Sequence, residues 1–468
     1  MTDLTTDLTE VDSTNAPVET AQTEPPADDT TFADFDVRQG IVDSLADAGI
    51  LKPFPIQAMT LPVALGGHDI IGQAKTGTGK TLGFGVPLLH QVTAPDEEGF
   101  DALASPGAPQ ALVVVPTREL AVQVTGDLKT ASTRRKVRIE SVYGGRAYEP
   151  QIAALQRGTE VVVGTPGRLI DLSQRGNLDL RHVKVAVLDE ADEMLDLGFL
   201  PDVERILGML PERRQTMLFS ATMPGPIITL ARTFLTQPTH IRAEQVDASA
   251  IGEKTAQFVY RAHALDKVEL LARTLQATDR GPTMVFTRTK HRAKKMARQL
   301  NAAGVPAVEL HGNLSQNART RNMEAFHSGR ATTLVATDIA ARGIHVDDVA
   351  LVVHADPPTE HKAYLHRSGR TARAGAQGTV ITLMTDDQVR DVRDLTRQAG
   401  IKPTTTRVTP NHPLLAELAP GERTYAAPSS VSPAAAPEGS SRPAGGGNRS
   451  GARGSGRNTA DAGRSGGR

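Results

Sequence analysis

Short apolar runs, separated by longer stretches of mixed polar and apolar residues, recur along the chain from Phe32 to about residue 245. Each run is rich in Val, Ile and Leu, which favours buried strands over helices. The runs lie at 69–72, 111–115, 138–142, 160–163, 183–188, 216–219 and 239–242. Because these strands alternate with helical stretches, the pattern predicts a doubly wound parallel sheet.

A second series of apolar runs follows, near 257–260, 283–287, 307–310, 333–336, 350–353 and 379–382. We therefore expect two similar α/β domains, at 32–245 and 257–402, with a cleft between them. The small and polar residues at 246–256 are predicted to form the linker. Residues 1–31 are rich in Thr, Asp, Glu and Pro, and residues 403–468 are rich in Arg, Gly and Pro. Both end segments are predicted to be disordered tails.

The composition excludes several kinds of chemistry. The 468-residue chain contains no cysteine, which excludes disulfides, Cys-ligated zinc and thiol chemistry. Its N-terminal segment lacks the basic and apolar parts of a secretory signal. No apolar run reaches the roughly 20 residues that span a bilayer. We therefore expect a cytoplasmic protein that makes no contact with a membrane.

The net charge of −1 at pH 7 hides an uneven distribution of charge. Residues 1–36 contain ten acids and no Lys or Arg, whereas residues 440–468 contain six Arg and one Asp. The C-terminal Arg and Gly residues could attract RNA, although the last 43 residues contain no aromatic side chain for stacking on bases. A solvating tail is the alternative. Local motifs must therefore decide whether the chain binds nucleic acid.

The apolar run at 183–188 ends in three acids within four positions: Asp189, Glu190 and Asp192. Acids at the carboxyl end of a parallel strand lie where open α/β sheets bind ligands. Hydrolysis of a magnesium nucleotide needs one carboxylate near the metal and a second to orient water. Asp189 and Glu190 could supply both. The alternative is a solvated turn in which Asp189 caps the following helix.

A glycine-rich loop precedes this acidic segment by about 110 residues. Its Thr76, Gly77, Thr78 and Gly79 lead into Lys80 and Thr81, directly after the strand predicted at 69–72. Successive backbone N–H groups in such a loop turn toward phosphates, and the helix that follows adds positive potential. Lys80 would reach the β- and γ-phosphates, and the Thr81 hydroxyl would bind Mg²⁺. An ordinary glycine-rich turn is the alternative.

The segment Asp-Glu-Ala-Asp at 189–192, after this loop, resembles the DEAD-box family of ATP-dependent RNA helicases, of the bacterial type. The resemblance covers about residues 32–400 and implies two tandem RecA-like domains. It also implies that Gln57 reads adenine and that Phe32 belongs to the same nucleotide-binding element. The family usually has Thr where this chain has Phe54, which leaves Gln57 in place.

The resemblance further implies a path for RNA along loops of both domains. These loops carry arginines, hydroxyls and N–H groups at helix starts, which are the groups that contact phosphates. The residues carried over to this path are Thr117, Arg118, Gly145, Thr165, Arg168, Arg288, Gly312 and Thr337. Read alone, a Thr-Pro-Gly-Arg segment such as 165–168 is more often an ordinary turn.

Further family motifs imply residues that couple the two domains. These residues are Asp192, Ser220, Thr222, Asp338, Arg342, His366 and Arg367. Arg370 and Arg373 would be arginine fingers on the γ-phosphate, since planar guanidinium groups match its developing charge. The family usually has an Asp that contacts ribose where this chain has His345. If His345 does touch the nucleotide, His345→Asp should lower the KM for ATP.

The motifs together indicate an RNA-stimulated ATPase that separates RNA duplexes locally. The implied cofactors are ATP and Mg²⁺, and the implied catalytic residues are Lys80, Asp189, Glu190, Arg370 and Arg373. RNA, as single strands and short duplexes, is the expected partner, with ribosomal precursors or RNA-decay proteins as further candidates and a monomer as the expected state. Two alternatives stay open: an ATP-gated RNA clamp without useful unwinding, and a DNA translocase of the same superfamily.

Overall fold

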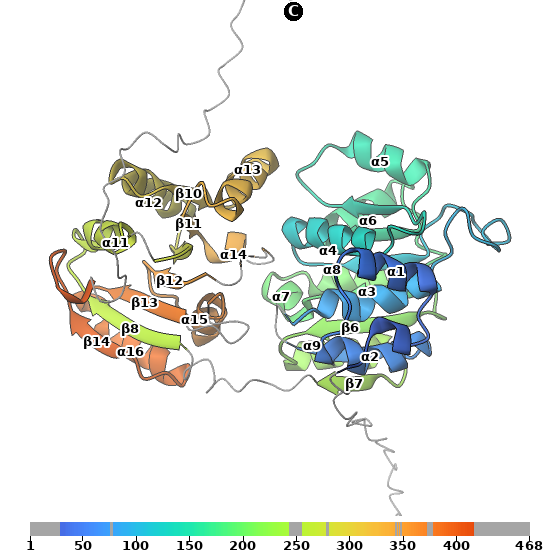
Figure 1. Cartoon of the computed structure of the whole chain (residues 1–468), viewed down its shortest axis with the longest axis horizontal. Coiled ribbons are helices and arrows are strands. Elements are labelled where there is room, and N and C mark those ends of the chain that lie inside the picture. Colours follow the sequence, from blue (N-terminus) through green and yellow to red (C-terminus); the bar gives the residue numbers. More distant parts are fainter. Residues whose placement is uncertain are drawn as a thin grey trace, which may run out of the picture. The chain divides into compact units, whose positions relative to one another are not determined.

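The computed structural model describes residues 29–74, 78–242, 255–277, 280–341, 344, 346, 349–371 and 378–415. Within these residues the strands form two parallel sheets of seven strands each (Figure 1). The linker predicted at 246–256 and the two predicted tails lie almost entirely outside the described residues. We refer to residues 29–242 as the first domain and to residues 255–415 as the second domain.

The first sheet has the order β3-β4-β2-β5-β6-β1-β7. Its strands are β1 (Ile70–Gln73), β2 (Ala111–Val114), β3 (Ile139–Val142), β4 (Val161–Gly164), β5 (Val185–Leu188), β6 (Gln215–Ser220) and β7 (Thr239–Arg242). The helices of this domain are η1 (Phe32–Asp34), α1 (Gln39–Asp47), α2 (Pro55–Leu65), α3 (Lys80–Gln91), α4 (Arg118–Thr130), α5 (Tyr148–Gln156), α6 (Pro166–Gln174), α7 (Ala191–Asp196), α8 (Leu200–Leu207) and α9 (Gly225–Phe234). All seven strands predicted for this domain are therefore confirmed.

The second sheet has the order β10-β11-β9-β12-β13-β8-β14, which repeats the order of the first sheet strand for strand. Its strands are β8 (Thr255–Arg261), β9 (Thr283–Phe286), β10 (Ala307–Leu310), β11 (Thr333–Ala336), β12 (Leu351–His354), β13 (Gly378–Met384) and β14 (Thr404–Arg407). The helices of this domain are α11 (Lys267–Leu275), α12 (Lys290–Ala302), α13 (Gln316–His327), α14 (Asp338–Ala341), α15 (His361–Ser368), η2 (Asp386–Gln388) and α16 (Val389–Gln398).

Strand β14 lies in the segment that the sequence assigned to the C-terminal tail. It pairs in parallel with β8, so the second domain extends beyond the predicted boundary at residue 402. Its side chains are mostly exposed, and three of the four are Thr. An edge strand without buried apolar residues has no hydrophobic pattern to reveal it, although β-branched Thr suits a strand.

Alternate residues along the central strands enter cores on opposite faces of each sheet. In the first domain Val113 and Val187 belong to one buried cluster, whereas Leu112 and Leu188 belong to the other. Because successive strand side chains point to opposite faces, a strand covered by helices on both faces must be apolar throughout. The second domain divides its core in the same way. This packing holds the carboxyl ends of the strands, where the polar motifs begin, at one edge of each sheet.

Candidate nucleotide and RNA sites

The loop between β1 and α3 leads into a buried lysine, Lys80, at the start of the helix. Gly79 has a φ of +80°, and an added Cβ would lie 2.6 Å from both Gln57 Nε2 and Phe54 Cδ2. Lys80 is 6% exposed, yet its Nζ forms no hydrogen bond with any residue that the structure describes. Burying an ammonium group without compensation is unfavourable. The end of this loop therefore fits an anionic ligand.

The acids after β5 are buried next to this lysine. Asp189 is 3% exposed and Glu190 is 7% exposed, and the Glu190 N–H donates to Asp189 Oδ1 at 3.0 Å. Burial raises the pKa of Asp189 to about 7, against the opposing effect of the Lys80 charge. A desolvated carboxyl with this pKa would gain from a nearby cation. Asp189 is thus well suited to a metal ion.

Glu190 differs from Asp189 in its electrostatics and in its backbone. Burial alone would raise the pKa of Glu190, but a hydrogen bond with Glu193 and the positive charge of Lys80 hold it below the usual value. Its φ of 53° and ψ of 53° place it in the left-handed region. Among the described non-glycine residues, Gln237 is the other one with a positive φ. Such a conformation costs energy and is found most often at functional sites.

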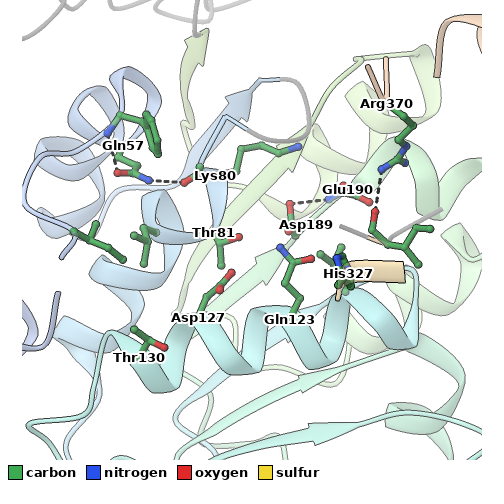
Figure 2. A pocket seen from close by; sticks show the side chains of 16 residues that line it. Gln57, Lys80, Thr81, Gln123, Asp127, Thr130, Asp189, Glu190, His327 and Arg370 are labelled. Carbon is green, nitrogen blue, oxygen red and sulfur yellow. Dashed lines mark hydrogen bonds between the residues drawn. The ribbon is translucent and has the colours of Figure 1, made fainter. Parts of the chain in front are cut away.

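Lys80, Asp189 and Glu190 line one pocket, which is shown in Figure 2. In this view Lys80 extends from the start of α3 toward the two acids. Thr81 also lines the pocket. Arg370 of the second domain is a further lining residue, and its Nη1 donates to the Ile344 carbonyl at 3.0 Å. The described end of the predicted phosphate loop, the acid pair and one predicted arginine finger therefore line the same pocket.

The donor set fits a nucleotide that shares a magnesium ion with the protein. No group of three or more His, Cys, Asp or Glu in the described part of the chain could hold a metal by itself. Mg²⁺ is commonly bound by one or two protein ligands together with substrate phosphates and water. The Thr81 hydroxyl and the Asp189 carboxylate would be those ligands, and Lys80 would neutralise phosphate charge.

Gln57 lies at the other end of the pocket, beside the loop. Its Oε1 accepts from the Phe54 N–H at 2.9 Å, and its Nε2 donates to the Gly79 carbonyl at 2.7 Å. Each amide end keeps one further hydrogen-bonding position, because the oxygen has two lone pairs and the nitrogen two hydrogens. Phe32, by contrast, is 2% exposed in the hydrophobic core and does not line the pocket. The structure therefore gives the pocket Phe54 instead of Phe32.

The coupling residues of the first domain form one hydrogen-bonded group. The N–H and the Oγ1 of Thr222 both donate to Asp192 Oδ2 at 2.8 Å. Ser220 Oγ accepts from the Asp192 N–H at 3.2 Å and donates to the Thr222 carbonyl at 2.7 Å. The start of α7 is thereby attached to the end of β6. A shift of the acidic segment would be transmitted to residues 220–222 through these bonds.

The RNA-path residues of the first domain follow three adjacent strands. Thr117 caps α4 by accepting from the Leu120 N–H, and the Arg118 guanidinium covers Gly145, whose added Cβ would lie 2.3 Å from Arg118 Nη1. Thr165 directly precedes α6 after β4. Because β3, β4 and β2 are neighbours, these loops share one edge of the sheet.

Arg168 has a different environment from the one the sequence predicts. It is 8% exposed, and both terminal nitrogens donate to the Arg146 carbonyl at 3.2 Å. Its guanidinium also lies over the Tyr148 ring, 3.9 Å from the centroid. Arg168 therefore holds the 144–146 loop in place rather than presenting its charge to solvent.

The second domain repeats this arrangement at the ends of β9, β10 and β11, which are again adjacent. Arg288 is exposed after β9, and its N–H donates to Asp356 Oδ2 at 3.0 Å. Gly312 is exposed in the loop after β10. Thr337 follows β11, and its N–H donates to the Leu310 carbonyl at 3.2 Å. The predicted RNA-path residues thus occupy equivalent edges of the two sheets.

Buried Arg367 and partly exposed Asp338 form an ion pair within the second domain. Arg367 Nε and Nη2 donate to the two oxygens of Asp338 at 2.5 and 2.7 Å, and Nη1 donates to the Asp356 carbonyl at 2.8 Å. Arg367 is 3% exposed. The family motif implies that Arg367 couples the two domains, whereas here its guanidinium is bonded to residues of its own domain. Neighbouring His366 is exposed.

Five residues that the sequence singles out lie outside the described part of the chain. They are Thr76, Gly77, Arg342, His345 and Arg373. Other pocket residues have no place in the sequence-based prediction, among them Ile50, Gln123, Asp127 and Thr130. The last three recur at intervals of three and four along α4. This spacing is the signal for one polar helix face, but it does not reveal what that face meets.

Comparisons with known proteins show which family the chain resembles. A DEAD/DEAH box helicase family model matches residues 54–230, and a helicase conserved C-terminal domain model matches residues 266–375. The DEAD-box ATP-dependent RNA helicase CshA of Geobacillus kaustophilus is 40% identical over 79% of this chain and 76% of its own length. Its namesake from Bacillus cereus strain ATCC 10987 is 40% identical over 79% of this chain and 68% of its own length.

Solved structures show the same likeness. A structure described as S. cerevisiae Dbp5 bound to RNA and ADP BeF3 matches with a TM-score of 0.70 and 27% identity, over 83% of this chain and 99% of that chain. No helix within the described residues is long and apolar enough to cross a membrane. The two matched family models together cover more than half of the chain. This chain therefore belongs to the DEAD-box family of ATP-dependent RNA helicases.

Proposed function

We propose that this helicase hydrolyses ATP when RNA is bound, and that closure of its two domains separates short RNA duplexes without reading their sequence. The observation that carries the proposal is the unpartnered, buried Lys80 beside the buried pair Asp189 and Glu190. These groups suit the phosphates, the metal and the attacking water of a nucleotide hydrolase.

In the nucleotide step, Gln57 uses its remaining N–H and lone pair to pair with N7 and the amino group of adenine. Lys80 would bind the phosphates, and Thr81 and Asp189 would hold Mg²⁺, in part through water. When bound, the metal neutralises the charge that develops on the phosphates. A bound cation would favour the ionised form of Asp189, against the effect of burial on its pKa.

Glu190 orients the attacking water and accepts its proton. A base must be ionised at the working pH, and the lowered pKa of Glu190 meets this condition. The left-handed backbone directs this side chain differently from that of Asp189, so the two acids can serve different atoms. Arg370 and Arg373 contribute positive charge to the γ-phosphate from the second domain.

RNA contacts are made mainly with phosphate and ribose. Thr117, Thr165 and Thr337 offer hydroxyls near helix starts, and Arg118 and Arg288 offer charge. Contacts of this kind position a strand but carry no base information, so weak sequence preference follows. Contacts with the 2′-OH would favour RNA over DNA. Arg168 supports this path by fixing the 144–146 loop.

The coupling step links the two ligands. In the first domain, hydrogen bonds among Asp192, Ser220 and Thr222 connect the acidic segment with the end of β6. In the second domain, the ion pair between Arg367 and Asp338 connects the last turn of α15 with the start of α14. If closure requires both ATP and RNA, each ligand must raise the affinity for the other by the same factor. The site thus predicts mutual, ATP-dependent binding of RNA.

Two assays on the full chain test the proposal: ATP hydrolysis with added RNA or DNA, and separation of a short RNA duplex. We expect RNA to stimulate hydrolysis more than DNA, and ATP to promote strand separation. Stimulation by RNA without strand separation would favour an ATP-gated clamp, and stimulation by DNA would favour a translocase. The cytoplasmic location, the monomeric state and the partners in ribosome assembly or RNA decay stay predictions.

A further inference from the structure

Helix α12 (Lys290–Ala302) has a basic outer face. Five of its 13 residues are Lys or Arg, none is Asp or Glu, and all five basic side chains are exposed. Its buried residues are Ala293, Met296, Ala297 and Leu300. The chain has no acidic residue from Arg280 to Val308, so no local acid balances this charge.

Three of these cations have no partner within the described residues. Lys290 Nζ donates to Asn313 Oδ1 at 2.9 Å, and Arg292 pairs with Asp356 at 3.1 Å. Lys294, Lys295 and Arg298 form no hydrogen bond or ion pair with any part of the chain that the structure describes. Lys294 and Arg298 are four residues apart, so they lie on one side of the helix, with Lys295 beside them.

Helix α16 shows the usual arrangement of charge on a surface helix of the same domain. Its Arg390, Arg393 and Arg397 are also exposed, but Asp391 and Asp394 are interspersed with them. Arg397 pairs with Asp394 at 2.9 Å. Neighbouring like charges destabilise a helix, and interspersed acids relieve this effect. The unrelieved charge of α12 therefore indicates an anionic partner.

The position of α12 relates it to the RNA path. The helix begins directly after β9 and Arg288, where Thr289 caps it by accepting from the Arg292 N–H. It packs on β10 and β11, the strands whose carboxyl ends carry Gly312 and Thr337 (Figure 1). At 1.5 Å per residue it extends about 20 Å away from that edge. Its outer face thus continues from the RNA path along the side of the second domain.

The chemistry of the face selects among forms of RNA. It carries Lys and Arg but no Phe, Tyr or Trp, so it can bind phosphates but offers no aromatic platform for unstacked bases. A duplex keeps its bases stacked inside and presents phosphates outside. We propose that Lys294, Lys295 and Arg298 bind the backbone of an RNA duplex next to the strand in the RNA path. This inference rests on the proposed function, since it requires an RNA-binding protein.

The test compares three variants of the full chain by fluorescence anisotropy, with a blunt RNA duplex and with a short single strand. The variant K294Q/K295Q/R298Q should bind the duplex at least about tenfold more weakly. Each lost phosphate contact lowers the salt slope by about 1, so the slope should fall by about 2 to 3. Affinity for the single strand and its stimulation of ATP hydrolysis should change little. Gln keeps a good helix propensity, and a thermal melt checks folding.

Two matched variants separate position from net charge. R390Q/R393Q/R397Q removes three charges from α16 and should leave duplex binding unchanged. K294R/K295R/R298K keeps the charge of α12 and should bind the duplex like the parent. Equal duplex affinity in the α12 and α16 glutamine variants would overturn the proposal. Polyglutamate serves as a third probe. If K294Q/K295Q/R298Q loses binding of polyglutamate but keeps binding of the duplex, the proposal is also overturned, and the face is assigned to an acidic polypeptide. If the parent binds neither form of RNA, the proposed function itself fails.

Discussion

The two domains share one strand order, but they treat a lysine at the same position in opposite ways. In the first, Lys80 begins the helix after β1, and its Nζ has no partner among the described residues. In the second, Lys267 begins the helix after β8, and its Nζ donates to the carbonyls of Ala355 and Leu383 at 3.2 and 2.9 Å. Both lysines are buried. One is available to a ligand, and the other joins two strands.

The acids after the equivalent strands β5 and β12 differ in the same sense. Asp189 has a pKa raised to about 7, chiefly by burial, in a pocket with Lys80. Asp356 accepts from the Arg288 N–H and pairs with Arg292. Polar groups satisfied by the protein stabilise it, whereas unsatisfied ones store binding energy for a ligand. The comparison teaches that a shared strand order does not by itself make a ligand site, since the two domains differ in whether the buried lysine has a hydrogen-bond partner among the described residues.

The largest expected effect is on catalysis in the first domain. Glu190→Gln removes the proposed base while keeping the size of the side chain. RNA-stimulated turnover should fall by about 10² to 10⁴, the range typical of a general base. Binding of a fluorescent ATP analogue should persist, because Lys80, Thr81 and Gln57 are unchanged. Turnover within a few-fold of the parent would refute the role assigned to Glu190.

Exchanging each buried lysine for Met tests the comparison directly. Lys80→Met should abolish measurable ATP binding without lowering the melting temperature, since the lost ammonium has no hydrogen-bond partner among the described residues. Lys267→Met should keep ATP binding but lower stability by about 1–3 kcal/mol, because two buried carbonyls lose their donor. Equilibrium unfolding and nucleotide titration of both variants provide the measurements. The same effect in both variants would contradict the contrast between the domains.

The sequence predicts the environment of Lys80 but not that of Lys267. The glycine-rich loop and the Asp-Glu-Ala-Asp segment predict that Lys80 binds phosphates, because both motifs have a mechanism tied to their spacing. Nothing in the residues around Lys267 shows that β12 and β13 bring carbonyls to it. Those contacts come from strands about 90 and 115 residues away in the chain. A local pattern does not encode such long-range neighbours.

The strands and the pocket also show how far a local sequence pattern can predict the structure. Buried runs such as 183–188 reveal central strands, because they are apolar on both faces, whereas the exposed Thr residues of β14 do not. Gln57 is found at the pocket as the family motif implies. The resemblance also implies that Phe32 belongs to the nucleotide-binding element, but its side chain lies in the hydrophobic core, where an aromatic ring is equally well accommodated. The sequence alone does not tell whether Phe32 or Phe54 lines the pocket.

Lys267 also predicts how stability depends on pH. Burial, partly opposed by Asp356, lowers its pKa to about 8 from 10.5. Between about pH 8 and 10.5 the unfolded chain therefore binds this proton while the folded chain has released it. The free energy of unfolding should rise with pH across that window and should not depend on this group below it. Lys267→Met should lose this rise, which denaturant titrations at pH 7.5, 8.5 and 9.5 would measure against the parent. Parallel curves would show that Lys267 is not desolvated.

The smallest expected effect concerns how closely the first domain fits around its ligand. Gly79→Ala forces a left-handed residue to carry a Cβ, at about 1–2 kcal/mol, and directs that Cβ at Gln57 and Phe54. ATP affinity should fall roughly tenfold, with kcat at saturation less affected. Gly126→Ala, in α4, is the control, since its Cβ would meet no atom within 4 Å of the described residues. Its affinity for ATP should match that of the parent. If both variants bind ATP normally, the loop tolerates an added Cβ next to Gln57 and Phe54, and the close fit around Gly79 does not matter for binding.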